Sequence, residues 1–328
     1  MLNYIIRRIA ILFPFLFLIS VIAFIVIQLP PGNYVDSYIR NLELQGGRLN
    51  DEQKAALERQ YGLDKPVLTQ YFMWISNIVI RGDFGNSFRY QRPVRDILSE
   101  RIPRTVGISL TSIVLTWIIA IPIGILSALK QYSIWDYLFT FISFLGLSIP
   151  AFLLALILLY FVYSKTGFMV TGIFSPEYRY EPWSIPRFID MLRNLWLPLF
   201  VLAVTGSAGL IRTLRATLLD ELRKQYVTTA RSKGLPEKRV ILQYPIRIAI
   251  NPLISTIGWM LPGMVGGELV VSKVLNLPTV GPVLLEATMA QDMYLAGAFV
   301  LILSALTIIG TIISDILLAW ADPRIRYD

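Results

Sequence analysis

Residues 226–252 read YVTTARSKGLPEKRVILQYPIRIAINP, a polar and basic stretch between two apolar runs that are too long for a soluble fold. The centre of this stretch predicts a short helix, a glycine stop and a second helix. Gly234 suits the position after a helix end because glycine adopts the left-handed conformation without steric cost, and Pro236 fits the first turn of the next helix. Ala230 and Gly234 are four residues apart, which predicts one helical face nearly bare of side chains. Such a face is shaped to dock into a groove on another protein, whereas the simpler alternative is a plain connector.

The run Thr-Ala-Arg-Ser-Lys-Gly-Leu at 229–235, followed by Asn-Pro at 251–252, resembles the coupling loop of ABC-transporter permeases of the dipeptide/oligopeptide/nickel family. In that family the loop carries the helix that contacts the ATP-hydrolysing subunit. The sequence departs from the general transporter pattern at Thr228 and Thr229, where a Glu-Ala pair is common. The resemblance implies that six residues couple this chain to an ATPase: Thr229, Ala230, Arg231, Lys233, Gly234 and Leu235.

Composition also indicates a membrane protein. Hydrophobic residues make up 55% of the 328 residues, mean hydropathy is +0.59, and charged residues are only 16%. The sequence contains no cysteine and no histidine, which excludes a disulfide framework and removes the commonest general base and zinc ligand. The net charge of +8 is concentrated in particular loops and does not indicate nucleic-acid binding.

Apolar runs occur at 9–29, 105–129, 134–163, 195–210, 248–271 and 296–320. Each is about long enough to cross a bilayer, so the predicted fold class is an all-α integral membrane protein with six transmembrane helices. The 212–247 loop carries nine Lys/Arg against three acids, and Arg7 and Arg8 precede the first run. The positive-inside rule therefore predicts cytoplasmic N- and C-termini in a bacterial or archaeal plasma membrane.

The predicted domains are a first transmembrane helix (1–29), an extracytoplasmic segment (30–103) and a five-helix permease core (104–328) that contains the 212–247 coupling loop. In the extracytoplasmic segment, Asn50-Asp51-Glu52 predicts a capped helix that ends at Gly62, and 70–80 predicts a second helix. The segment is either a spacer or a contact for a substrate-binding protein.

Two places in the predicted spans favour distorted helices: Ser148-Ile149-Pro150 and Pro262 to Gly267. Glu268 follows the second of these, and a carboxylate inside a span is a functional candidate. The candidate translocation-path residues are therefore Ser148, Pro150, Pro262 and Glu268. Ordinary kinks and an interfacial carboxylate in water are the alternatives.

Asp315 lies near the inner end of the last predicted span, and Arg212 and Arg215 lie at the inner end of the fourth. A structural ion pair between Asp315 and one of these arginines is favoured over a proton relay. Basic residues of the 212–247 loop can also contact anionic membrane lipids.

The ATP-binding loop of P-loop ATPases is rich in glycine and ends in Gly-Lys-Ser/Thr. In this sequence no lysine follows a glycine, so this motif is absent. The chain is therefore expected to hold no cofactor, with ATP and Mg bound by partner subunits, and not to be an enzyme itself. The family resemblance implies two ATP-binding subunits, a second permease subunit (paralogue or identical) and an extracytoplasmic substrate-binding protein. The expected function is ATP-driven import of peptides or a similar small solute, with the substrate open among dipeptide, oligopeptide, nickel chelate and oligosaccharide. An ion-driven secondary transporter is the alternative.

Overall fold

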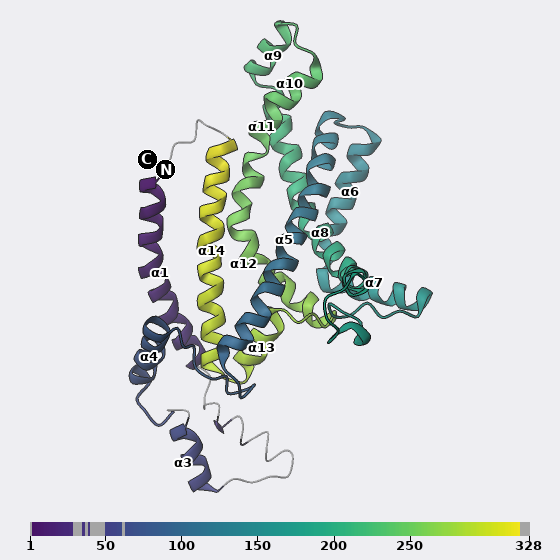
Figure 1. The fold of residues 1–328 in the computed structure, drawn as a ribbon. Coiled ribbons are helices and arrows are strands. Elements are labelled where there is room, and N and C mark those ends of the chain that lie inside the picture. Colours follow the sequence, from purple (N-terminus) through teal and green to yellow (C-terminus); the bar gives the residue numbers. More distant parts are fainter. Residues whose placement is uncertain (1, 29–34, 37–38, 40–49, 61–62, 322–328) are drawn as a thin grey trace. The chain divides into compact units, whose positions relative to one another are not determined.

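The computed structural model describes residues 2–28, 35–36, 39, 50–60 and 63–321 (Figure 1). Inside the helices, the side chains of residues 2–9, 12, 27, 51, 60, 258–259, 261–268 and 321 are not described. The chain divides into two compact units, one formed by 1–5, 105–278 and 307–328 and the other by 6–104 and 279–306. The described residues are mostly helical, as the predicted all-α fold class requires.

The described helices are α1 (Leu2–Gln28), α3 (Asp51–Gln60), α4 (Val67–Ser76), the π-helix η1 (Asn77–Arg81), α5 (Val94–Leu129), α6 (Ile134–Ser148), α7 (Ala151–Thr166), the 3₁₀ turn η2 (Pro176–Tyr178), α8 (Ile185–Leu222), α9 (Gln225–Ser232), α10 (Glu237–Gln243), α11 (Pro245–Ala249), α12 (Asn251–Val274), α13 (Val280–Met289) and α14 (Met293–Ala321). Apart from Leu29, which lies outside the described residues, each of the six predicted apolar runs thus falls in a helix or a helix pair.

Among the described residues, four stretches are long and apolar enough to cross a membrane: Val94–Leu129, Ile185–Leu222, Glu237–Ile257 and Met293–Trp320. The pair α6 and α7 counts as a fifth if it forms one bent span. The number of six spans stays a prediction.

Helix α8 is the centre of the first unit. It packs against α6, α7, α11 and α12, and one apolar face of it is buried. Small residues let the helices approach closely, since a Cβ on Gly146 of α6 would lie 3.2 Å from the Cβ of Ala208 on α8. Helix α8 therefore connects four neighbouring helices.

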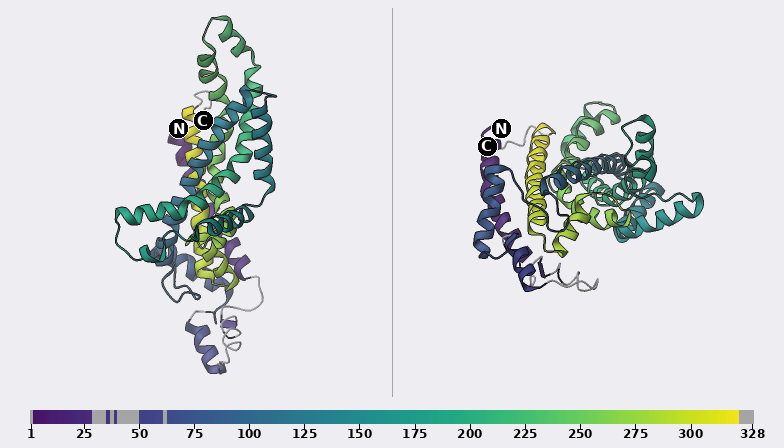
Figure 2. Two further views of the ribbon diagram at one scale, coloured as in Figure 1. Left: turned by 90° about the vertical axis from the view of Figure 1, so that its right-hand side faces the viewer. Right: turned by 60° about the horizontal axis from the view of Figure 1, so that its bottom comes forward.

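The predicted distortion at Ser148-Ile149-Pro150 is a real break. Helix α6 ends at Ser148, α7 begins at Ala151, and the two axes differ by 101°. Ile149 is extended, with φ −88° and ψ 119°, because a residue before proline is pushed out of the helical region. Figure 1 shows α7 running across the direction of α6, and in the left view of Figure 2, which is turned by 90°, α7 points towards the viewer.

The other predicted distortion does not interrupt its helix. The backbone of α12 is helical from Asn251 to Val274, through the whole Pro262 to Gly267 stretch. The side chains of Pro262 and Glu268 lie outside the described residues.

In the second unit, the predicted capped helix is α3. The Asn50 side chain accepts a hydrogen bond from Gln53 N (2.8 Å), and the Gln53 side chain accepts one from Asn50 N (3.0 Å). This reciprocal pair is a capping box, here with Asn and Gln, and it satisfies two free donors at the helix start. The predicted end at Gly62 lies outside the described residues.

Helix α4 packs on α1 through aromatic rings. Phe24 contacts both Tyr71 and Trp74, with ring centroids 5.4 Å and 6.1 Å away. The Tyr71 hydroxyl also shares a 2.7 Å hydrogen bond with the Ser20 hydroxyl. These contacts fix Trp74, which is only 2% exposed.

Trp74 also lies against Gly297 of α14, and this contact yields a testable prediction. A Cβ at Gly297 would lie 2.8 Å from Cζ2 and 2.9 Å from Cη2 of the indole. Gly297→Ala should therefore displace a buried ring and lower the free energy of unfolding by about 2 kcal/mol, measured by thermal unfolding in detergent.

Gly107→Ala is the matched control, because Gly107 is also helical and its added Cβ would meet nothing within 4 Å. This control should be neutral or slightly stabilising, since alanine favours helix over glycine. Equal effects of the two substitutions would contradict the predicted clash.

A buried carboxylate fixes the loop that precedes α5. Asp292, directly before α14, is 0% exposed and accepts hydrogen bonds from Ser87 Oγ (2.5 Å) and Arg89 N (3.0 Å). Its other oxygen accepts from Leu295 N (3.2 Å) and so caps α14. Burial raises the pKa of Asp292, and these hydrogen bonds oppose that change.

Candidate functional site

The predicted helix, stop and second helix are confirmed within residues 226–252. Helix α9 ends at Ser232, Gly234 has a left-handed φ of +76°, and Pro236 directly precedes α10. Gly234 N donates to Arg231 O (2.9 Å), which closes the end of α9. We call residues 225–243 the α9–α10 segment; in Figure 1 it lies beyond the ends of α6 and α8.

The α9–α10 segment has a small core of its own. Val227 and Ala230, one helical turn apart on α9, are 0% and 5% exposed and pack with the buried Val240 of α10. Tyr226 and Leu235 pack against these three residues.

The predicted bare face is therefore wrong. Ala230 points into the segment's own core, and Gly234 lies beyond the helix end, so the two residues do not share an exposed helical face. The physical reason is that α10 folds back and covers the small face of α9. The small side chain of Ala230 serves contact between the two short helices.

The exposed side of α9 is polar. Its hydroxyl groups bond to carbonyls of the same helix, with Thr229 Oγ1 donating to Gln225 O (2.9 Å) and Ser232 Oγ to Thr228 O (3.0 Å). Thr229, Arg231, Lys233 and Gly234 are all exposed, and Leu235 is half-buried. Of the six predicted coupling residues, four are therefore accessible to a partner and two hold the segment together.

Arg231 links the two helices of the segment. Its Nε and Nη2 donate to the two carboxylate oxygens of Glu237 at 3.1 Å and 2.6 Å. The hydrogen bond to Glu237 raises the pKa of the Arg231 guanidinium. Both side chains are about half exposed, and exposed ion pairs contribute at most about 1 kcal/mol. The pair therefore orients the surface more than it stabilises the fold.

Beside this pair, α10 carries an open, mostly apolar hollow whose lining includes two basic side chains. It is lined by Pro236, Lys238, Arg239, Leu242 and Gln243. Arg239 Nε donates to the Gln243 side chain at 3.3 Å. The exposed surface of the segment therefore offers positive charge and hydroxyl groups around a small apolar area.

Near the C-terminal end of α8, the structure corrects the predicted ion pair. Arg215 donates from Nε and Nη2 to the two oxygens of Asp136 on α6, both at 2.7 Å, so its carboxylate partner is Asp136 and not Asp315. Ser127 and the backbone N of Tyr132 also donate to Asp136. Sequence reasoning missed Asp136, which lies at the start of a long apolar run. The signal that could have identified it is that it is a lone acid in this run.

The remaining predicted residues are spread along the chain. Arg212 lines a mostly apolar cavity of about 170 Å³ with residues of α6 and α8. Ser148 and Pro150 lie together at the α6–α7 break, where Ser148 Oγ donates to Phe144 O (2.8 Å). Asp315 lies in α14. Ser148 and Pro150 therefore lie close together, whereas the side chains of Pro262 and Glu268 are outside the described part of the structure.

Residues 120–327 match the family "Binding-protein-dependent transport system inner membrane component", and residues 1–111 match the N-terminal part of the same kind of component. The chain belongs to this family. Members are components of transport systems rather than enzymes, and the family together with the long apolar helices makes this chain a multi-pass protein of the bacterial inner membrane.

Several relatives match along the whole chain. The oligopeptide transport system permease protein AppB of Bacillus subtilis (strain 168) is 35% identical, with 99% of each chain covered. The glutathione transport system permease protein GsiC of Escherichia coli (strain K12) is 33% identical, and OppB of Haemophilus influenzae, an oligopeptide permease protein, is 29% identical, each with 100% of both chains covered. The resemblance to peptide permeases is confirmed.

A solved structure shows the same fold. A chain of the MetNI methionine ABC transporter, captured in inward-facing conformations, aligns with a TM-score of 0.50 at 15% identity. The alignment covers 69% of this chain and 96% of that one. An ABC-transporter permease fold is therefore present in this family member.

Proposed function

We propose that this chain is the permease subunit of an ATP-driven, binding-protein-dependent importer for peptides or a similar small solute, and that it supplies half of the translocation path. The observation that carries the coupling role is the separately folded α9–α10 segment, which has its own core and an exposed polar surface. Family membership and the peptide permeases among the relatives support the transport role. The alternative of an ion-driven secondary transporter is not supported, because the family depends on binding proteins.

In the proposed mechanism, an ATPase subunit binds the exposed side of the segment. Closure of the ATPase dimer then moves the segment as one body, because Val227, Ala230 and Val240 hold α9 and α10 together. The movement reaches α6, α7, α11 and α12 through α8. Coupling requires that the ATPase contact the segment differently in the inward- and outward-facing states.

The proposed assembly contains a second permease subunit, two ATP-binding subunits that hold ATP and Mg, and an extracytoplasmic substrate-binding protein. In this proposal the chain crosses the membrane six times, the 212–247 loop and both termini are cytoplasmic, and 30–103 is extracytoplasmic. Ser148, Pro150, Pro262 and Glu268 remain the candidate path residues.

Because the sequence has no cysteine, the proposed topology can be tested by single cysteines in intact cells. Thr229→Cys should react with a membrane-impermeant maleimide only after the cells are opened. Tyr180→Cys, at a position 91% exposed in the connection between α7 and α8, should react in intact cells. Reaction of Thr229→Cys in intact cells would place the segment outside and overturn the coupling role.

Gly234 gives a second test, in which backbone conformation is separated from bulk. A Cβ at Gly234 would meet nothing within 4 Å, but the φ of +76° is costly for most residues, by about 1–2 kcal/mol. Asparagine tolerates this conformation. We expect Gly234→Val to lower ATP-driven uptake several-fold and Gly234→Asn to retain most of it, measured in vesicles reconstituted with all partners.

Gly234→Trp adds bulk on the exposed side and should abolish uptake while the chain still inserts in the membrane. If Gly234→Trp transports normally with full ATPase coupling, docking at this turn is wrong. Uptake that persists without ATP but stops when ion gradients collapse would instead support a secondary transporter.

A further inference from the structure

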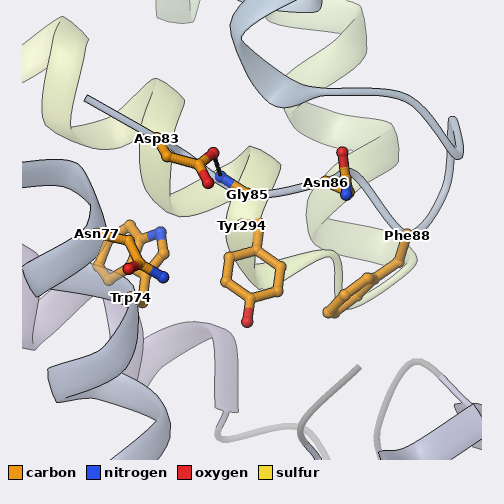
Figure 3. A pocket seen from close by; sticks show the side chains of 7 residues that line it. All are labelled: Trp74, Asn77, Asp83, Gly85, Asn86, Phe88 and Tyr294. Atoms are coloured by element: carbon orange, nitrogen blue, oxygen red, sulfur yellow. Dashed lines mark hydrogen bonds between the residues drawn. The ribbon is translucent and has the colours of Figure 1, made fainter. Parts of the chain in front are cut away.

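The second unit contains a pocket of about 280 Å³ that the coupling mechanism does not use. Figure 3 shows its lining, which comes from α4, η1, the loop before α5 and the start of α14. The lining residues are Trp74, Asn77, Asp83, Gly85, Asn86, Phe88 and Tyr294. They include one carboxylate, two amides and three aromatic rings, but no basic side chain.

One wall of the pocket carries an unsatisfied hydrogen-bond donor. Trp74 is 2% exposed, and its Nε1 has no hydrogen-bond partner among the described residues. In Figure 3 this nitrogen lies on the side of the indole that faces Tyr294. Buried polar atoms are nearly always paired, and an indole N–H can only donate. A ligand here therefore has to supply an acceptor oxygen.

Asp83 favours a positively charged group on the ligand. One of its oxygens accepts a hydrogen bond from Gly85 N (2.8 Å), drawn as the dashed line in Figure 3, and the other has no partner among the described residues. A free carboxylate oxygen beside aromatic rings favours a cation, which the ring faces also attract.

The pocket wall is rigid where the loop crosses Tyr294. A Cβ on Gly85 would lie 3.0 Å from the Tyr294 ring, so the loop backbone lies directly on it. Phe88 contacts the same ring edge-to-face at 5.1 Å, and Ser87 is tied to the buried Asp292. The site is therefore preformed.

These chemical requirements exclude several ligand classes. An anion would face Asp83 without a basic partner, and calcium would need six or more oxygen ligands where the lining offers a single carboxylate. A ligand must combine a cation with an oxygen acceptor, and 280 Å³ lies just below the usual range for small-molecule sites.

We propose that this pocket binds the free amino terminus of a peptide, with the α-ammonium at Asp83 and the first carbonyl oxygen accepting a hydrogen bond from Trp74 Nε1. Asn77 is placed to bond the same peptide unit, and the first side chain lies between the rings. This inference rests on the proposed peptide import, because it names a place where the end of a transported peptide is held.

The test measures binding of three probes to the full-length chain in detergent by equilibrium dialysis. Ala-Ala and Ala-Ala amide should bind, and N-acetyl-Ala-Ala should not, because acetylation removes the charge and keeps the carbonyl. Asp83→Asn keeps the acceptor for Gly85 N but loses the charge, so it should weaken Ala-Ala binding at least about tenfold. Trp74→Phe should weaken it several-fold.

Asp64→Asn is the matched control, an exposed acid of the same unit outside the pocket, and it should bind Ala-Ala as the unchanged chain does. Equal binding of the acetylated probe, or equal losses in Asp83→Asn and Asp64→Asn, would overturn the proposal. Direct binding of phosphatidylethanolamine without any Ala-Ala binding would also overturn it, because the ammonium would then belong to a lipid. ATP-driven uptake by the complete assembly is measured separately: uptake without amino-terminal binding defeats this inference alone, and binding without uptake defeats the proposed function.

Discussion

Asp136→Ala should lower the free energy of unfolding by about 3 kcal/mol, because it leaves the Arg215 guanidinium, whose side chain is only 27% exposed, without its carboxylate. Asp136 is 1% exposed and accepts both hydrogen bonds of Arg215 at 2.7 Å. Its loss also frees Ser127 and the backbone N of Tyr132. Thermal unfolding of the purified chain in detergent measures the effect, and uptake should fall with it because α6 loses its ion pair to α8.

Two further variants separate a lost pair from a lost charge. Asp220→Ala removes an exposed acid from the same helix as Arg215 and should have little effect. The double variant Asp136→Leu with Arg215→Met removes both charges and should be less destabilising than Asp136→Ala alone. If the double variant is the less stable of the two, attraction within the pair matters more than the unpaired arginine.

This ion pair shows why part of the site could not be predicted from sequence. Arg215 was recognised as a charge needing a partner, but its partner is 79 residues earlier in the chain. Residue spacing cannot select between Asp136 and Asp315, because the choice depends on which helix packs against α8. Gly234 was predicted correctly because its conformation depends on its immediate neighbours alone.

Ala230 and Gly234 differ in the same way: one depends on packing between helices, and the other on its immediate neighbours alone. The orientation of Ala230 depends on α10 folding back so that Val240 covers it, which is a contact between two helices. Local patterns therefore predicted where the helices of the segment begin and end, but not which face is exposed. The two proline sites differ for a similar reason: Pro150 ends a helix, whereas α12 continues past Pro262.

The three-residue core of the α9–α10 segment predicts the second large effect. Val240→Asp places a carboxylate at a position that is 0% exposed, between Val227 and Ala230 and without a basic group in that core. Burying an unpaired charge costs several kcal/mol, which exceeds what so small a core can supply. We expect α9 and α10 to separate locally and ATP-driven uptake to fall at least about a hundredfold, because a segment that no longer moves as one body cannot pass a displacement to α8.

Leu242→Asp is the matched control for the folding of the segment, since it makes the same kind of change on the same short helix at a position 53% exposed. Limited proteolysis should cut the segment between α8 and α12 rapidly in Val240→Asp and at the unchanged rate in Leu242→Asp. Both variants should keep the melting temperature of the unchanged chain, because the long helices do not depend on this core. Full uptake by Val240→Asp with a protease-sensitive segment would mean that coupling does not require a folded α9–α10 unit, and the proposed transmission through α8 would be wrong.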